Sequence, residues 1–243
     1  MRRSAALFTI ALALGAMILA PRSAARADGR EEGPFEIEKC QTIDKPGSYK
    51  LVRNITFTLG PPFVCLSITA SFVTVDLGGF SISAPGAISG TGIEAPAGTL
   101  SITVRNGSIA GFLSGVDLGG EGSIVEGLRV SGRFRSFLGI GAVGIVKGNT
   151  VFDFSGVPGQ GTGISASGVV TGNYVFSNGT GMSISVGSTV IGNTSVNNLS
   201  GFGGIVVNCP SNVTDNTAVN NVNLGSNLVL QGEGCTNTNN VAP

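Results

Sequence analysis

The chain has 243 residues, of which 42% are hydrophobic and only 12% are charged, and it contains 39 glycines but no His and no Trp. This composition is typical of an ordered, turn-rich domain and argues against a disordered chain. Because the 14 basic and 14 acidic side chains balance, neither a nucleic-acid-binding surface nor a polyanion-binding surface is indicated, and no nucleic-acid partner is expected.

The first 27 residues are typical of a secretory signal peptide. Two arginines precede the apolar run AALFTIALALGAMILA, and small residues flank Arg26 at the −3 and −1 positions of a cleavage site before Asp28. The run is shorter than the ~20 apolar residues that a membrane span needs, so a retained anchor is the weaker alternative. We expect a secreted or periplasmic protein that has no membrane span after cleavage and begins with a polar lead over residues 28–39.

Four cysteines follow, in two pairs of nearly equal spacing, one near each end of the remaining chain. Export favours disulfides, because they persist in oxidising compartments. We therefore predict that Cys40 pairs with Cys65 and that Cys209 pairs with Cys235. A zinc site is the alternative, but the chain has no Cys-x-x-Cys spacing and no His to support it.

The chain repeats itself about every 20 to 24 residues, as in VTGNYVFSNGTG from Val170 and VIGNTSVNNLSG from Val190. Each unit holds a short β-branched run, a turn, and then Gly followed by an apolar residue. Dense glycine and runs of Val and Ile disfavour helical repeats, and leucine-rich repeats would need several spaced leucines. The repeat predicts an all-β fold, a single parallel β-helix of about seven coils over residues 40–243, with residues 40–75 as N-terminal cap and first coil.

Alignment on the valine before each turn places equivalent residues of successive coils in columns. Two of these columns consist of asparagine. Asn tolerates the left-handed backbone of a sharp corner, and its amide can bond to the amides above and below. We interpret both columns as structural ladders inside the coils. The first comprises Asn149, Asn173, Asn193 and Asn216, and the second comprises Asn178, Asn198 and Asn221.

A charged column directly follows the aligned valines and comprises Asp76, Arg105, Glu126 and Lys147. Opposite charges on neighbouring coils favour a ladder of surface ion pairs that supports the coil register. The alternative is a polysaccharide site in which Arg105 and Lys147 bind carboxylates and one of them acts as a base.

Glu94 and Asp117 both follow the apolar residue after a repeat glycine, so they should stack on adjacent coils about 5 Å apart. Like charges this close destabilise the fold unless a proton or a cation is shared. The two carboxylates are candidates for the acid and nucleophile of a glycosidase, and with Arg105 they are the candidate catalytic residues of a polysaccharide lyase or hydrolase. With Glu121 they are candidate calcium ligands. The alternative is two separately solvated surface carboxylates.

Two stretches, CQTIDKPGSY over residues 40–49 and VTVDLGGF over residues 73–80, precede the Gly-Asn coils. Together they resemble the secreted bacterial proteins with right-handed parallel β-helix repeats, relatives in fold of the pectate lyases. The resemblance covers residues 40 to about 240, and it implies a right-handed β-helix, export and the first disulfide. It implies no activity, because the fold hosts lyases, hydrolases, epimerases and inert spikes alike.

The sequence contains few residues that are candidates for catalysing a reaction on a polysaccharide. Polygalacturonases and mannuronan epimerases use a His, which is absent, and pectate-lyase-like chemistry needs basic residues beside an acidic calcium cluster. Only the region from residue 94 to 153 carries enough charge, with Arg129, Arg133 and Lys147 as substrate-binding candidates. We therefore favour an exported scaffold or carbohydrate-binding protein without catalytic activity or cofactor. The alternative is a polysaccharide lyase or hydrolase that acts on an acidic glycan, with calcium as a candidate cofactor.

Overall fold

The computed structural model describes residues 33–58, 60, 63–85, 90–133, 135–156, 160–199, 202–221 and 227–243. The predicted signal peptide and residues 28–32 of the predicted lead lie outside the described residues. The described residues form 22 β-strands and no helix. Accordingly, this part of the chain contains no helix long and apolar enough to cross a membrane.

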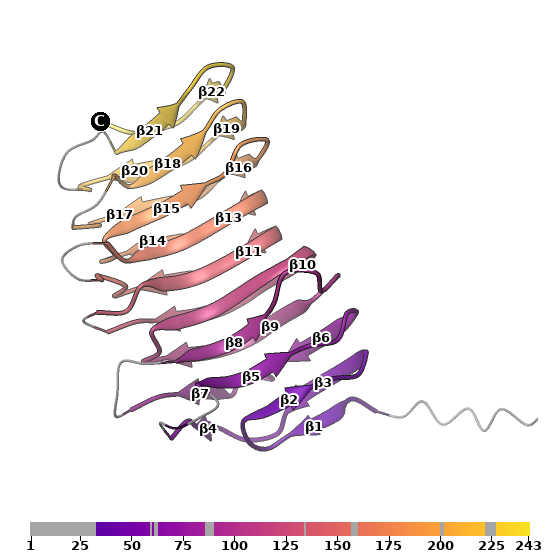
Figure 1. Cartoon of the computed structure of the whole chain (residues 1–243). Helices are drawn as coiled ribbons and strands as arrows, with labels where there is room; N and C mark the ends of the chain where they lie inside the picture. The colour runs from indigo at the N-terminus through magenta and orange to yellow at the C-terminus, as the bar shows by residue number, and fades with distance from the viewer. Residues whose placement is uncertain are drawn as a thin grey trace, which may run out of the picture. The chain divides into compact units, whose positions relative to one another are not determined.

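The strands stack as a parallel β-helix of about eight turns (Figure 1). The fold class predicted from the repeat is therefore confirmed. Strand β1 already pairs in parallel with β3, so the stack includes residues of the expected lead, and the last coil runs on to β22.

The strands fall into three columns, which we name sheets A, B and C. Sheet A contains β2 (Gln41–Ile43), β5 (Val64–Ile68), β8 (Thr91–Ala95), the first parts of β10 (Ser114–Ser131), β11 (Leu138–Lys147) and β13 (Thr162–Thr171), then β15 (Thr180–Ile184), β18 (Ile205–Asn208) and β21 (Leu228–Gln231).

Sheet B contains β1 (Phe35–Ile37), β3 (Gly47–Leu51), β6 (Val73–Asp76), the start of β9 (Thr103–Ala110), later parts of β10, β11 and β13, then β16 (Thr189–Ile191), β19 (Asn212–Thr214) and β22 (Thr236–Thr238). Sheet C contains β4 (Ile55–Thr56), β7 (Ser81–Ser83), the ends of β9 and β10, β12 (Thr150–Phe152), β14 (Tyr174–Phe176), β17 (Thr194–Val196) and β20 (Thr217–Val219).

The coil register agrees with the alignment made from the sequence. Val75 pairs with Val104, and the column continues through each aligned valine to Val213. These valines are fully buried, as are the apolar residues of sheet A that follow each repeat glycine, such as Ile93 and Ile140. Alternate strand residues thus fill one continuous core, and their neighbours in the strand point outward.

A glycine column lines the inner side of sheet A. A Cβ atom added to any of these glycines would lie within 2.7 Å of a carbonyl oxygen in the next coil. No side chain fits at that distance, so glycine is required here by close approach of the backbones rather than by turn geometry. The members are Gly92, Gly115, Gly139, Gly163, Gly181 and Gly204.

The two predicted asparagine ladders are present and buried. Asn193 is typical: its Nδ2 donates to Oδ1 of Asn216 at 3.0 Å and to the carbonyl oxygen of Val170 at 2.8 Å, and its Oδ1 accepts from N and Nδ2 of Asn173 at 3.0 Å. All hydrogen-bonding groups of the amide are therefore satisfied inside the stack. Each ladder has one more member than expected, Asn240 in the first and Asn227 in the second.

The expectation that the ladder asparagines themselves adopt the left-handed conformation is wrong. The left-handed residue is the one before each ladder asparagine: Gly148, Gly172 and Gly192 have φ of 63°, 62° and 63°, and Asp215 has φ of 55°. The ladder asparagine can then keep an ordinary backbone and turn its amide inward, while the residue before it makes the corner.

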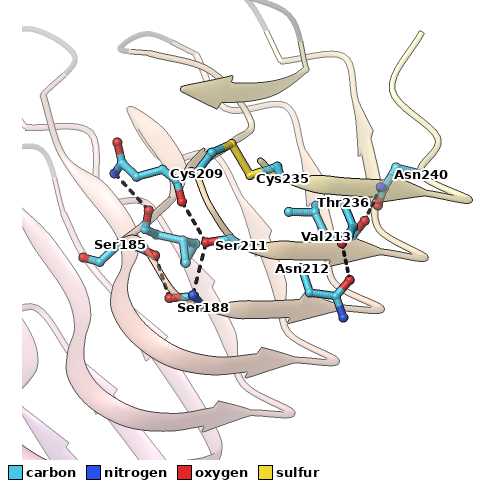
Figure 2. The surroundings of a disulfide bond; sticks show 11 residues. Ser185, Ser188, Cys209, Ser211, Asn212, Val213, Cys235, Thr236 and Asn240 are labelled. Atoms are coloured by element: carbon cyan, nitrogen blue, oxygen red, sulfur yellow. Dashed lines mark hydrogen bonds between the residues drawn. A yellow bond between two sulfur atoms is a disulfide. The ribbon is translucent and has the colours of Figure 1, made fainter. Parts of the chain in front are cut away.

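Both predicted disulfides are present. The sulfur atoms are 2.05 Å apart in Cys40–Cys65, which joins the first two coils of sheet A, and 2.11 Å apart in Cys209–Cys235, which joins the last two coils. Figure 2 shows the second bond beside a short serine ladder, in which the backbone nitrogen of Ser188 donates to Oγ of Ser211 at 3.1 Å. Each disulfide therefore ties together two adjacent coils near one end of the stack.

The interior position of Asn193 makes its ladder testable. Replacing Asn193 by Leu leaves the buried groups of Asn173 without an acceptor, so we expect a loss of about 1–3 kcal/mol in the free energy of unfolding. The same change at Asn240, which is half-buried at the end of the ladder, should cost less because water can replace the lost bonds. Thermal melts of both variants measure this, and equal Tm values for Asn193→Leu and wild type would contradict the ladder.

The glycine column predicts a contrast within one coil. A Cβ at Gly163 would lie 2.7 Å from the oxygen of Gly181 and 2.8 Å from Nδ2 of Asn178, whereas one at Gly172 would meet nothing within 4 Å. We expect Gly163→Ala to lower the free energy of unfolding by about 1–3 kcal/mol through overpacking. Gly172→Asn should be nearly neutral, because Asn tolerates positive φ. Urea unfolding compares the two variants, and similar midpoints would count against the close-approach explanation.

Candidate functional site

The two predicted acidic residues lie on the outer side of sheet A. Glu94 in β8 pairs with Asp117 in β10, so the expectation that they stack on adjacent coils is met by the register. Glu94 is half-buried and Asp117 is exposed, and both alternate with buried core residues. The same column continues with small residues, namely Ser67 before the pair and Gly141, Ser165 and Ser183 after it.

A shallow hollow of about 220 Å³ lies beside Asp117. Gly141, opposite Asp117 on the next coil, also lines it, and the side chains of Asp117 and Leu138 lie close over its backbone, because a Cβ there would lie 3.0 Å from Oδ1 of Asp117 and 2.9 Å from Cδ2 of Leu138. Leu138 and Val143 give the hollow an aliphatic part. Its polar part consists of Asp117 and the serines Ser165, Ser167 and Ser185.

Partial burial of the Asp117 carboxyl group raises its pKa above the ordinary value. Burial also raises the pKa of Asp153, which does not line this hollow. A raised pKa therefore does not by itself identify the site. What distinguishes Asp117 is the combination of partial desolvation, the carboxylate of Glu94 on the adjacent coil, and an open hollow on its other side.

The charged column lies on sheet B and forms ion pairs. Nε of Arg105 is 3.1 Å from Oδ2 of Asp76, and Nζ of Lys147 is 2.7 Å from Oε2 of Glu126. Each partly exposed pair contributes about 0–1 kcal/mol. Sequence reasoning missed two further members, since Glu36 and Lys50 occupy the same column below Asp76 and continue the alternation of charge.

The other basic candidates lie apart from the acidic pair. Arg129 is on the outer side of sheet C, where its guanidinium carbon is 4.8 Å from the centre of the Phe152 ring. Phe152 in turn stacks on Phe176, with ring centroids 4.8 Å apart. Arg133 donates from Nη1 to the carbonyl oxygen of Pro85 at 2.9 Å. Cation–π attraction to Phe152 therefore holds Arg129 in place. The hydrogen bond from Arg133 joins its own loop to the one that contains Pro85.

Within the described parts of the chain, no three His, Cys, Asp or Glu side chains come together as a metal-binding group. Glu121, the third candidate calcium ligand, lies where sheet A leads into sheet B and forms an isolated bridge with Leu100. The calcium interpretation therefore gains no support from the geometry.

A larger hollow of about 500 Å³ occurs at the first coil, lined by residues around β2 and β4 that include Glu38 and Arg53. None of the predicted catalytic or substrate-binding residues lines it. A hollow of about 230 Å³ on sheet B is lined by Arg105 and Asp76, but these two residues are paired with each other there. The hollow on sheet A is lined by Asp117, one of the two acidic residues singled out from the sequence. No protein-family model, curated protein or solved structure matches this chain.

The raised pKa of Asp117 gives a signed prediction. The folded-state pKa lies above the ordinary value of 3.8, so the ionised carboxylate costs stability above the folded pKa, and this cost disappears as the pH falls below the unfolded value. Asp117→Asn should therefore raise the Tm at neutral pH, and the gain should shrink towards zero in acid. Thermal melts across this pH range measure it.

The same melts, repeated with added calcium, separate desolvation from cation binding. A bound cation would raise the Tm of the wild type but not that of Asp117→Asn. If Asp117→Asn is less stable than wild type at neutral pH without calcium, Asp117 makes a stabilising contact and the explanation by desolvation is wrong.

Proposed function

We propose that this protein is exported and binds carbohydrate on the outer side of sheet A, without catalysing a reaction. The observation that carries the proposal is the hollow beside Asp117, where one carboxylate, three serines and two aliphatic side chains line the same space. Pockets that bind small polar ligands combine apolar contact area with a few placed polar groups in this way.

Sugars suit such a lining because each ring has hydroxyl groups at its rim and C–H groups on its faces. The Asp117 carboxylate can accept hydrogen bonds from hydroxyls, and serine hydroxyls can both donate and accept. Leu138 and Val143 offer aliphatic surface to a ring face. The flat, open side of a β-helix also leaves room for a polymer to extend over several coils.

Export is supported by the two disulfides, which are consistent with an extracellular or periplasmic location. It is also supported by the signal-peptide pattern of the first 27 residues. Membership of the secreted β-helix proteins with the pectate-lyase fold belongs to the same proposal, since it rests on the resemblance of residues 40–80 and on the parallel β-helix.

A retaining glycoside hydrolase is the second candidate function. Adjacent coils hold Glu94 and Asp117 about 5 Å apart at the backbone, near the separation of about 5–5.5 Å between the carboxyl groups of retaining enzymes. The raised pKa of Asp117 would suit a general acid. A lyase for acidic glycans has less support, because Arg105 and Lys147 are paired with carboxylates on sheet B.

A polysaccharide panel tests the proposal. The mature protein, whose intact mass should correspond to a chain that begins at Asp28 and carries two disulfides, is incubated with insoluble neutral, acidic and amine-bearing polysaccharides. We expect retention by at least one of them and a loss of about tenfold in affinity for Asp117→Ala. Asp215→Asn, a change of charge at an exposed corner away from the hollow, is the control.

The outcomes separate the candidates. Reducing ends released by the wild type but not by Glu94→Gln or Asp117→Asn would establish the hydrolase instead. Retention by no polysaccharide, without any cleavage, would contradict both functions and leave a structural role.

A further inference from the structure

The described side chains that line the hollow beside Asp117 carry negative charge and no positive charge. Among the described residues that line it, Asp117 is the only charged one, and no basic side chain contributes. Glu94 adds a second carboxylate on the adjacent coil. The surroundings are acidic as well, since residues 28–243 contain 10 basic and 14 acidic side chains. An anionic sugar would meet repulsion here from both carboxylates.

The basic residues of the charged column are paired with carboxylates on another sheet. Arg105 and Lys147 lie on sheet B, where each is in contact with a carboxylate of its own column. The backbone of the β-helix also fixes the spacing of Glu94 and Asp117, because hydrogen bonds of the sheet hold the two strands in register. Their repulsion can therefore be relieved by a proton, or by a cation that enters the hollow from solvent.

From these observations we propose that the ligand is a polysaccharide of amino sugars, whose protonated amine pairs with Asp117 while its hydroxyls contact Ser165 and Ser167. The inference rests on the proposed function, and it names the class of carbohydrate. The alternative function, a polysaccharide lyase or hydrolase, would require an acidic glycan, and the inference names a basic one instead.

The geometry of the hollow suits this ligand. Asp117 is exposed and lines the open hollow, so an ammonium group can approach its carboxylate from solvent without moving the backbone. The hydroxyls of Ser165 and Ser167 form no hydrogen bond with any described residue and so are open to a sugar hydroxyl. At a partly desolvated carboxylate, attraction to an ammonium group is stronger than it is in bulk water.

Matched oligosaccharides isolate the role of the amine. Oligomers of β-1,4-linked glucosamine and of N-acetylglucosamine have the same backbone and differ at the nitrogen, which is a charged ammonium group in the first and an uncharged acetamide in the second. By isothermal titration calorimetry with the mature protein, we expect the glucosamine oligomer to bind at least about tenfold more tightly. This preference should weaken as salt is added, since ion pairs at an open surface are screened.

Three variants test whether the oligomers bind at the hollow and whether Asp117 causes the preference for glucosamine. Asp117→Asn should remove the preference for the glucosamine oligomer, and Asp215→Asn should leave it unchanged. Gly141→Ala should weaken binding of both oligomers, because the added Cβ would displace the flexible ends of Asp117 and Leu138, which line the hollow. Circular dichroism and thermal melts confirm that each variant is folded before its affinity is compared.

Each outcome decides between the two proposals. Equal affinity for both oligomers, or a preference that survives in Asp117→Asn, overturns the amino-sugar inference and leaves carbohydrate binding standing. Binding of a neutral or acidic polysaccharide but of neither oligomer has the same meaning. Failure to bind any carbohydrate overturns the proposed function together with this inference.

Discussion

The whole structure depends on hydrogen bonds that run along the stack from one coil to the next. The strands supply most of these bonds, and the buried amides of the two asparagine ladders supply them at corners where the backbone must turn and the sheets are interrupted. A corner without such a partner would bury unsatisfied backbone groups, each at a cost of about 1–3 kcal/mol. The ladders therefore let a 20-residue coil turn sharply and still stack closely.

The residue type at the ladder corners differs between the earlier and the later coils. In earlier coils the equivalent positions are apolar: the backbone nitrogen of Leu128 donates to Oδ1 of Asn149, and that of Phe154 donates to Oδ1 of Asn178. An apolar residue is acceptable at the start of a ladder because only its backbone must reach the next amide. Each following asparagine donates from its backbone and side-chain nitrogens towards the next coil, so the amide oxygen of another asparagine is needed there as acceptor. This dependence explains why the ladders continue to the last coil and end at Asn240 and Asn227.

Much of the fold could be predicted because a repeat fixes which residues are equivalent. The valine column and the pairing of Glu94 with Asp117 both followed from one alignment, and both disulfides followed from the spacing of the cysteines. The positions missed lie where the repeat is incomplete, as at Glu36 and Asn240, in the end coils. The hollow could not be predicted either, because it depends on how side chains of several successive coils lie around Asp117, and the sequence alone does not place them.

In a rigid stack, two residues of like charge on adjacent coils are held close together by the backbone. On a flexible loop, two carboxylates can move apart into water, and their repulsion has little effect. Glu94 and Asp117 are held by strands that share a register with coils on both sides, so their backbones cannot separate without breaking sheet hydrogen bonds. The remaining freedom belongs to the side chains, and the exposed Asp117 has Glu94 on the coil before it and borders a hollow that extends to the coils after it. A cation in that hollow would therefore pair with Asp117 and lessen its repulsion from Glu94 while the backbone stays in place.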